Sequence, residues 1–164
     1  MNELTLPEAS DTERLGAALA RTLPGAASGA LVAYLEGELG SGKTTLARGL
    51  LRALGVEGAV RSPTYTLLEC YDSAHQRVLH ADLYRLGEAA ELEPLGLRDE
   101  LAPGALLLIE WPERAAQGLP PPDLRVTLTV VDRGRKVQLR AISEAGRMWL
   151  AAALARLNSE LKRV

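Results

Sequence analysis

The chain lacks phenylalanine altogether and has one cysteine, only three lysines and no long apolar run. The single cysteine, Cys70, excludes an internal disulfide framework and a metal centre built from several cysteines. No apolar run approaches the roughly 18 residues of a transmembrane helix, so we expect no membrane span. The acidic start, MNELTLPEASDTE, lacks the basic and apolar regions of a signal peptide, so we expect a cytoplasmic protein.

Aliphatic residues make up most of the hydrophobic part of the chain. Hydrophobic residues make up 47% of the chain but aromatic residues only 4%, so the core is expected to consist of leucine, valine and alanine. A length of 164 residues fits one domain, and we expect residues 1–164 to form it. The net charge of −2 gives no sign of a protein that binds nucleic acid on its own through a basic face.

Apolar segments and amphipathic segments alternate along the chain, which is typical of an α/β fold. Short apolar segments at 31–36 and 105–111 are typical of buried strands. Leucines at four-residue spacing predict a helix that follows the first of these strands and ends at Gly55. We expect further strands at 3–6, 66–71, 77–84, 125–131 and 136–142, and a polar turn at 72–76. Further helices are expected after Ser10 or Asp11, over 144–162, and within 88–101 with a break near Pro94 and Gly96. The sheet is predicted to be mostly parallel, with antiparallel additions.

The segment from Gly37 to Thr44 matches the phosphate-loop pattern G-x-x-x-x-G-K-[ST], also called Walker A. Glycines let the backbone turn its N–H groups inward toward an anion, and the following helix presents its positive end. A lysine at this place reaches the β- and γ-phosphates, and the hydroxyl after it serves Mg²⁺. The predicted nucleotide-binding residues here are Gly37, Gly40, Ser41, Gly42, Lys43, Thr44 and Thr45.

Other nucleotide-binding classes fit this sequence less well. GTPases select guanine with an Asn-Lys-x-Asp motif, but the only asparagines are Asn2 and Asn158. The Ser-Gly-Gly signature of transporter ATPases is absent. A dinucleotide-binding G-x-G-x-x-G would need glycine where Thr45 stands. An ATPase or a small kinase remains.

Two carboxylates, Asp82 and Glu110, each end an apolar strand. Ligands of open α/β sheets bind at the carboxyl ends of strands, so both carboxylates are placed to face the phosphates. One would hold Mg²⁺, which prefers oxygen ligands, and the other would polarise a water molecule; the sequence leaves open which does which. The polar loop 62–66 carries hydroxyls that could sense a γ-phosphate, as switch segments do.

Five motifs together resemble the TsaE (YjeE) family, the P-loop ATPases of bacterial tRNA threonylcarbamoyladenosine (t6A) biosynthesis. They are GELGSGKTT, SPTYTLLE, HADLYRL, LGLRDEL and LIEWPE, and the resemblance extends over residues 12–113. It implies a P-loop NTPase-like three-layer sandwich that uses ATP and Mg²⁺. It also implies TsaB and TsaD as partners, and a tRNA contacted through their complex rather than alone. The protein would support the formation of N6-threonylcarbamoyladenosine at position 37 of tRNA without transferring the group itself.

The resemblance also assigns roles to individual residues. Lys43 would be the phosphate lysine and Thr44 a Mg²⁺ ligand, while Asp82 and Glu110 would be the acidic residues of the metal site. Trp111 would lie beside the nucleotide. Thr12 would lie near the adenine, and residues 62–66 would form the switch-like loop.

Three functions remain open at this point. The first is a regulatory ATPase, slow alone and stimulated by its partners, because no arginine is obviously the finger that speeds phosphoryl transfer. Arg61 and Arg85 flank the site motifs, however. The second is a small-molecule kinase, for which no arginine-rich lid is evident. The third is a protein that only binds nucleotide and docks through the 125–142 hairpin and the last helix.

Overall fold

The computed structural model describes residues 1–25, 29–73 and 76–161. Its strands form one seven-stranded sheet in the order β1-β7-β6-β2-β5-β4-β3. The strands are β1 (Asn2–Leu6), β2 (Leu31–Glu36), β3 (Leu68–Asp72), β4 (Arg77–Asp82), β5 (Leu106–Glu110), β6 (Leu124–Val130) and β7 (Arg135–Ala141). The helices are α1 (Ala9–Ala20), α2 (Lys43–Ala53) and α3 (Glu144–Leu161), with two 3-10 helices, η2 (Ala89–Leu95) and η3 (Pro112–Ala115).

The centre of the sheet is parallel and its edges are antiparallel, as expected. Strands β4, β5, β2 and β6 run parallel to one another. The hairpin partners β3 and β7 run antiparallel to β4 and β6, and β1 closes the other edge against β7. In the β4–β5 register Asp82 lies opposite Glu110. The two carboxylates predicted to act together are therefore neighbours at one end of the sheet.

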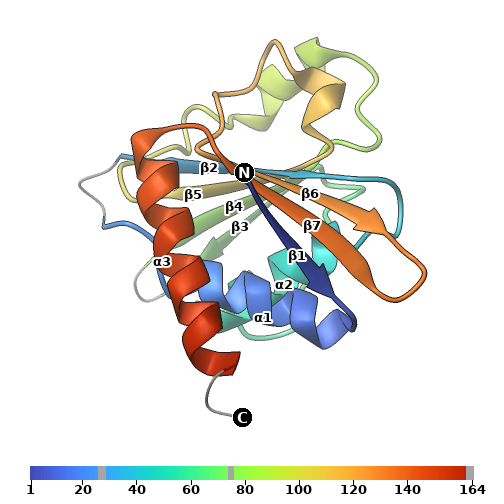
Figure 1. Cartoon of the computed structure of the whole chain (residues 1–164). Coiled ribbons are helices and arrows are strands. Elements are labelled where there is room, and N and C mark those ends of the chain that lie inside the picture. Colours follow the sequence, from blue (N-terminus) through green and yellow to red (C-terminus); the bar gives the residue numbers. More distant parts are fainter. Residues whose placement is uncertain (26–28, 74–75, 162–164) are drawn as a thin grey trace.

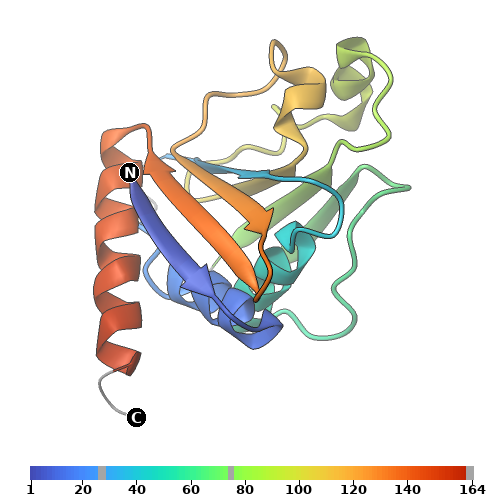
Figure 2. The ribbon, with the colours of Figure 1, turned by 45° about the vertical axis from the view of Figure 1, so that its right-hand side comes forward.

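The sheet is the middle layer of three. Helices α1 and α2 lie against one face, with α3 beside α1, while η2, η3 and their loops lie on the other (Figure 1). The turned view shows the same separation (Figure 2). Alternate residues of β2 serve the two faces: Leu31, Ala33 and Leu35 pack with the α-helices, and Val32 and Tyr34 pack with the 3-10 side. The buried core is almost entirely aliphatic, as the composition predicts.

One expected helix start was wrong, and one expected helix is a 3-10 helix that ends at the expected break. Helix α1 begins earlier than Ser10 or Asp11, because Glu8 is its N-cap and Asp11 accepts a hydrogen bond from the Glu8 N–H at 3.0 Å. The expected helix at 88–101 is only the 3-10 helix η2, which ends where Gly96 turns to φ 65°. Pro94 inside it lacks the N–H that an α-helix needs. Positions 74–75 of the expected 72–76 turn, and position 162 of the last helix, lie outside the described residues.

Among the described residues, no helix combines the length and the apolar composition that a bilayer span requires.

Candidate nucleotide site

The phosphate loop joins the end of β2 to the start of α2, as the motif predicts. Three of its glycines have positive φ: 138° at Gly37, 76° at Gly40 and 108° at Gly42. A Cβ at Gly37 would also lie 2.3 Å from the carbonyl oxygen of Leu128, so no other residue fits there without movement. Gly42 is the N-cap of α2. The loop is therefore curled over the positive end of a helix, where an anion is stabilised.

Lys43 is buried beneath this loop. Its Nζ donates to the carbonyl oxygens of Gly37 at 2.7 Å and Glu38 at 2.8 Å, and it lies 4.0 Å from the ring centroid of Trp111. Burial lowers the pKa of the Lys43 ammonium, and the nearby carboxylates of Glu110 and Asp82 oppose that shift. A phosphate would give this partly desolvated charge a stronger partner than two carbonyl groups.

Thr44 and Glu110 are joined directly. The Thr44 hydroxyl lies 3.0 and 3.1 Å from the two carboxylate oxygens of Glu110. On the other side, His80 Nε2 is 2.8 Å from Glu110 Oε1. Glu110 is only 2% exposed and His80 is fully buried. The carboxylate is therefore fixed between a helix residue and a neighbouring strand.

Asp82 holds the polar loop 62–66 in place. Its Oδ2 accepts hydrogen bonds from the hydroxyls of Ser62 and Thr64, the latter at 3.1 Å. Its Oδ1 accepts from the Tyr84 N–H at 2.9 Å. The proposed switch loop is thus attached through its hydroxyl groups to one of the two acidic residues of the site.

These residues surround a cleft of about 390 Å³. Eight of the sequence-predicted site residues line it: Gly40, Gly42, Lys43, Thr44, Thr45, Asp82, Glu110 and Trp111. Gly37 and Ser41 belong to the loop but are not among the described lining residues. Thr12 is 1% exposed and would lie 3.8 Å from a Cβ at Gly42, so it packs against the loop from α1. A contact between Thr12 and adenine stays a prediction.

Two functional candidates, Arg135 and His80, were missed by the sequence analysis, whereas Tyr84 stands in the HADLYRL motif. Arg135, at the start of β7, lines the cleft and donates to the carbonyl oxygens of Ser41 at 2.8 Å and Gly40 at 3.2 Å. Tyr84 lines it too, and its ring centroid is 4.9 Å from that of Trp111. His80 could have been found, because it stands two residues before Asp82 and so shares a face of the same strand. Nothing in the hairpin sequence indicates the contact of Arg135.

The oxygen atoms that line the cleft are suitable ligands for a magnesium ion. The described residues contain no group of three or more histidine, cysteine or acidic side chains that could enclose a metal. Mg²⁺, however, is usually held by one or two carboxylates together with substrate phosphates and water. Thr44, Asp82 and Glu110 offer oxygen atoms of that kind beside the phosphate loop.

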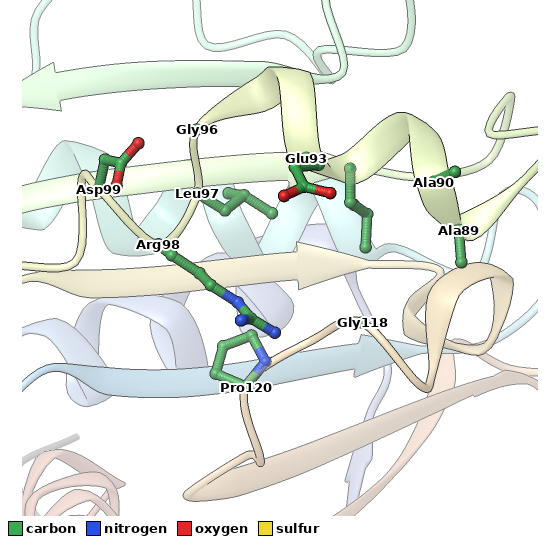
Figure 3. A pocket seen from close by; sticks show the side chains of 10 residues that line it. Ala89, Ala90, Glu93, Gly96, Leu97, Arg98, Asp99, Gly118 and Pro120 are labelled. Carbon is green, nitrogen blue, oxygen red and sulfur yellow. The ribbon is translucent and has the colours of Figure 1, made fainter.

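A second hollow lies on the 3-10 side of the sheet. It measures about 260 Å³ and lies between η2 and the segment that contains Gly118 and Pro120. Figure 3 shows the Arg98 side chain reaching toward Pro120 across it. None of the predicted site residues is among the described residues that line it.

A strand, a glycine-rich loop and a helix, with carboxylates at the ends of two adjacent strands, define a P-loop nucleotide-binding protein. The family model described as "Threonylcarbamoyl adenosine biosynthesis protein TsaE" matches residues 6–137. The chain belongs to the TsaE family, which takes part in t6A biosynthesis in tRNA. The resemblance found in the sequence is therefore confirmed.

Individual relatives agree with this assignment. The chain is 43% identical to the tRNA threonylcarbamoyladenosine biosynthesis protein TsaE of Haemophilus influenzae, over 75% of this chain and 78% of that protein. It is 39% identical to the TsaE protein of Synechocystis, over 70% of this chain and 73% of the relative. The solved structure titled "Crystal structure of Bacillus subtilus YdiB" has the same fold, with a TM-score of 0.78, 22% identity and coverage of 94% and 95% of the two chains.

Proposed function

We propose that this protein binds and hydrolyses ATP with Mg²⁺ and that this activity serves the formation of t6A at position 37 of tRNA. One observation carries the proposal. Lys43 and Thr44 at the start of α2, Asp82 at the end of β4 and Glu110 at the end of β5 all face one cleft. An ATP-hydrolysing site needs a phosphate cradle, a metal-binding hydroxyl and acidic groups to organise metal and water, and this cleft offers each of them.

Each residue has a definite task in this proposal. Lys43 exchanges its carbonyl partners for phosphate oxygens. Thr44 and Glu110, already paired, would hold the metal ion between them, and a bound Mg²⁺ supplies positive charge to the phosphates. Asp82 positions the 62–66 loop and the attacking water. Trp111 covers one side of the phosphate lysine.

The proposal extends to the setting of the reaction. Residues 1–164 act as a single P-loop ATPase domain in the cytoplasm. The domain works on a complex of TsaB and TsaD, contacts tRNA through that complex, and does not itself transfer the threonylcarbamoyl group. We expect slow hydrolysis by the protein alone and faster hydrolysis with the partners.

Multiple-turnover tRNA modification tests the proposal. Purified TsaB–TsaD is assayed with and without this protein, using the wild type, Lys43→Ala and Glu110→Ala. Lys136→Ala is the matched control, because Lys136 lies on β7 and pairs with Glu3 at 3.0 Å. We expect repeated cycles of tRNA modification only with the wild type or the control variant. Both site variants should lower the rate of ATP hydrolysis at least about 100-fold.

An assay with ATP labelled on its terminal phosphate distinguishes the proposed ATPase from a kinase and from a protein that only binds nucleotide. Label in free phosphate, released faster with the partners, supports the proposal. Label in a small metabolite would show a kinase instead. Stimulated tRNA modification without any consumption of ATP would leave a nucleotide-binding partner that is not an enzyme.

A further inference from the structure

The cleft has three cationic side chains at its wall, and two of them are already engaged. Lys43 donates to the carbonyl oxygens of Gly37 and Glu38, and Arg135 donates to those of Gly40 and Ser41. The third, Arg85, has no hydrogen bond or ion pair through its guanidinium within the described part of the chain. It lies instead over the ring of Tyr65, 4.4 Å from the centroid. Arg85 is therefore the cleft cation that is available for a new anionic partner.

Tyr65 belongs to the loop that Asp82 holds. The loop's Ser62 and Thr64 hydroxyls bind the Asp82 carboxylate, while Tyr65 is 84% exposed as a residue and its ring contacts Arg85. Asp82 is the last residue of β4, and Arg85 follows it by three positions. A movement of the 62–66 loop would therefore change both contacts. The ring–guanidinium contact is the weaker of the two, because such contacts contribute little at exposed positions.

We propose that Arg85 acts in cis on the terminal phosphate of ATP, and that Tyr65 withholds Arg85 until the 62–66 loop moves. This inference rests on the proposed ATPase function. In the reaction, the oxygen of a water molecule forms a bond to the terminal phosphorus, and the bond to the oxygen that remains on ADP breaks. The leaving oxygen keeps the electron pair, and a proton of the water is released to solvent. Negative charge on the transferred group is what a guanidinium stabilises.

No other described arginine near the site meets these conditions. Arg61 is exposed and is not among the residues that line the cleft, although it lies next to Ser62. Arg114 is exposed, lies 5.6 Å from the Tyr84 ring and also does not line the cleft. Arg135 lines it but is committed to the phosphate loop.

Arg85→Ala, Arg85→Lys and the control Arg61→Ala test the first half of the inference. We expect Arg85→Ala to lower kcat at least about 100-fold while KM stays within about threefold, because the guanidinium acts on charge that develops in the transition state. Arg85→Lys should recover only part of the loss, since an ammonium cannot match the planar fork. Arg61→Ala should keep wild-type kinetics. Equal losses in Arg61→Ala and Arg85→Ala would overturn the assignment.

Binding measurements decide the same point without turnover. By calorimetry, wild type and Arg61→Ala should bind Mg-ADP with aluminium fluoride more tightly than Mg-ADP alone, whereas Arg85→Ala should lose that advantage and keep its affinity for Mg-ADP. Retention of the advantage by Arg85→Ala would overturn the inference. Wild type that releases no phosphate, alone or with TsaB–TsaD, would contradict the proposed ATPase function, while the fluoride complex would still decide whether Arg85 faces the terminal-phosphate position.

Tyr65→Ala tests the second half. Removal of the ring should free Arg85 and raise the hydrolysis rate of the isolated protein about two- to fivefold, the factor that an exposed cation–π contact is worth. The double variant Tyr65→Ala/Arg85→Ala should show no such gain. An unchanged or lower rate in Tyr65→Ala, at unchanged Mg-ADP affinity, would contradict a withholding role.

Discussion

The buried carboxylate of Glu110 is held in place by side chains from two other elements. A buried carboxylate is costly unless its oxygens accept hydrogen bonds. Glu110 has two donors, the Thr44 hydroxyl from α2 and His80 from β4. The other ring nitrogen of His80, Nδ1, is buried with no hydrogen-bond partner among the described residues. The histidine therefore does little at this place except support Glu110.

His80→Leu should destabilise the protein more than His80→Gln does. Leucine removes a donor to a buried carboxylate, which costs about 1–3 kcal/mol of unfolding free energy. Glutamine carries an N–H group at similar reach and should recover most of that loss. Urea denaturation of the two variants and the wild type measures the difference. Equal stability of the leucine and glutamine variants would mean that the hydrogen bond to Glu110 contributes nothing.

The residues that sequence reasoning located share a local signal. Lys43 and Thr44 stand in a motif of fixed spacing, and Asp82 and Glu110 each follow an apolar strand. The link from His80 to Glu110 spans 30 positions, so no local pattern contains it. Tertiary pairing of this kind has to be seen in the fold.

At the scale of elements, short continuous apolar segments located the central strands of the phosphate site, and leucines at four-residue spacing located the helix. Strand β2 has the predicted bounds at both ends. The segment 88–101 was harder, because Pro94 and Gly96 interrupt a pattern that otherwise looks helical. The order of the strands has no local signature. It depends on which apolar faces meet, and hairpins β3–β4 and β6–β7 add the antiparallel edges.

Helices α1 and α2 approach each other through two glycines. A Cβ at Gly16 would lie 2.2 Å from the carbonyl oxygen of Leu46, and a Cβ at Gly49 would lie 2.3 Å from that of Glu13. Both contacts are with backbone, which cannot rotate away. The close approach keeps α1 against the helix that begins at the phosphate loop.

Gly49→Ala should therefore lower the unfolding free energy although alanine favours helices. The gain in helix propensity is about 1 kcal/mol, whereas forcing extra atoms into a packed contact typically costs about 1–3 kcal/mol. Contact with backbone at this distance places the cost at the upper end. Gly25→Ala is the control, because a Cβ there meets nothing within 4 Å. Thermal unfolding should show a lower Tm only for Gly49→Ala; a Tm at or above that of the wild type would show that the helices can separate freely.

At the scale of the whole molecule, the few aromatic rings divide between packing and the site. Trp149 is 1% exposed and donates its indole N–H to the Leu19 carbonyl at 2.9 Å, so this ring serves packing. Tyr34 is buried on the 3-10 side. Tyr84 and Trp111 line the cleft, and Tyr65 contacts Arg85 at its wall. Because leucine, valine and alanine fill most of the interior, half of the six aromatic side chains lie at the cleft.

The hairpin near the end of the chain completes the phosphate loop. Strand β7 returns antiparallel along β6 and brings Arg135 to the loop, 95 positions away from Gly40. Its Nε and Nη2 donate to two consecutive carbonyl groups of that loop. The alternating pattern of this hairpin in the sequence indicates only strands. The contact brings a side chain from the second half of the chain to the candidate nucleotide site.

Arg135→Gln should therefore weaken nucleotide binding without unfolding the protein. Hydrogen bonds from a charged donor contribute about 1.5–3 kcal/mol each, and loss of part of that support should lower Mg-ADP affinity about tenfold. Arg140→Gln is the control: Arg140 is exposed on the same strand and does not line the cleft. Calorimetric titration with Mg-ADP measures both variants, and circular dichroism checks that each is folded. Wild-type affinity of Arg135→Gln for Mg-ADP would contradict this prediction. The glycine-rich loop would then keep its shape without Arg135, and the hairpin would contribute to the sheet but not to the site.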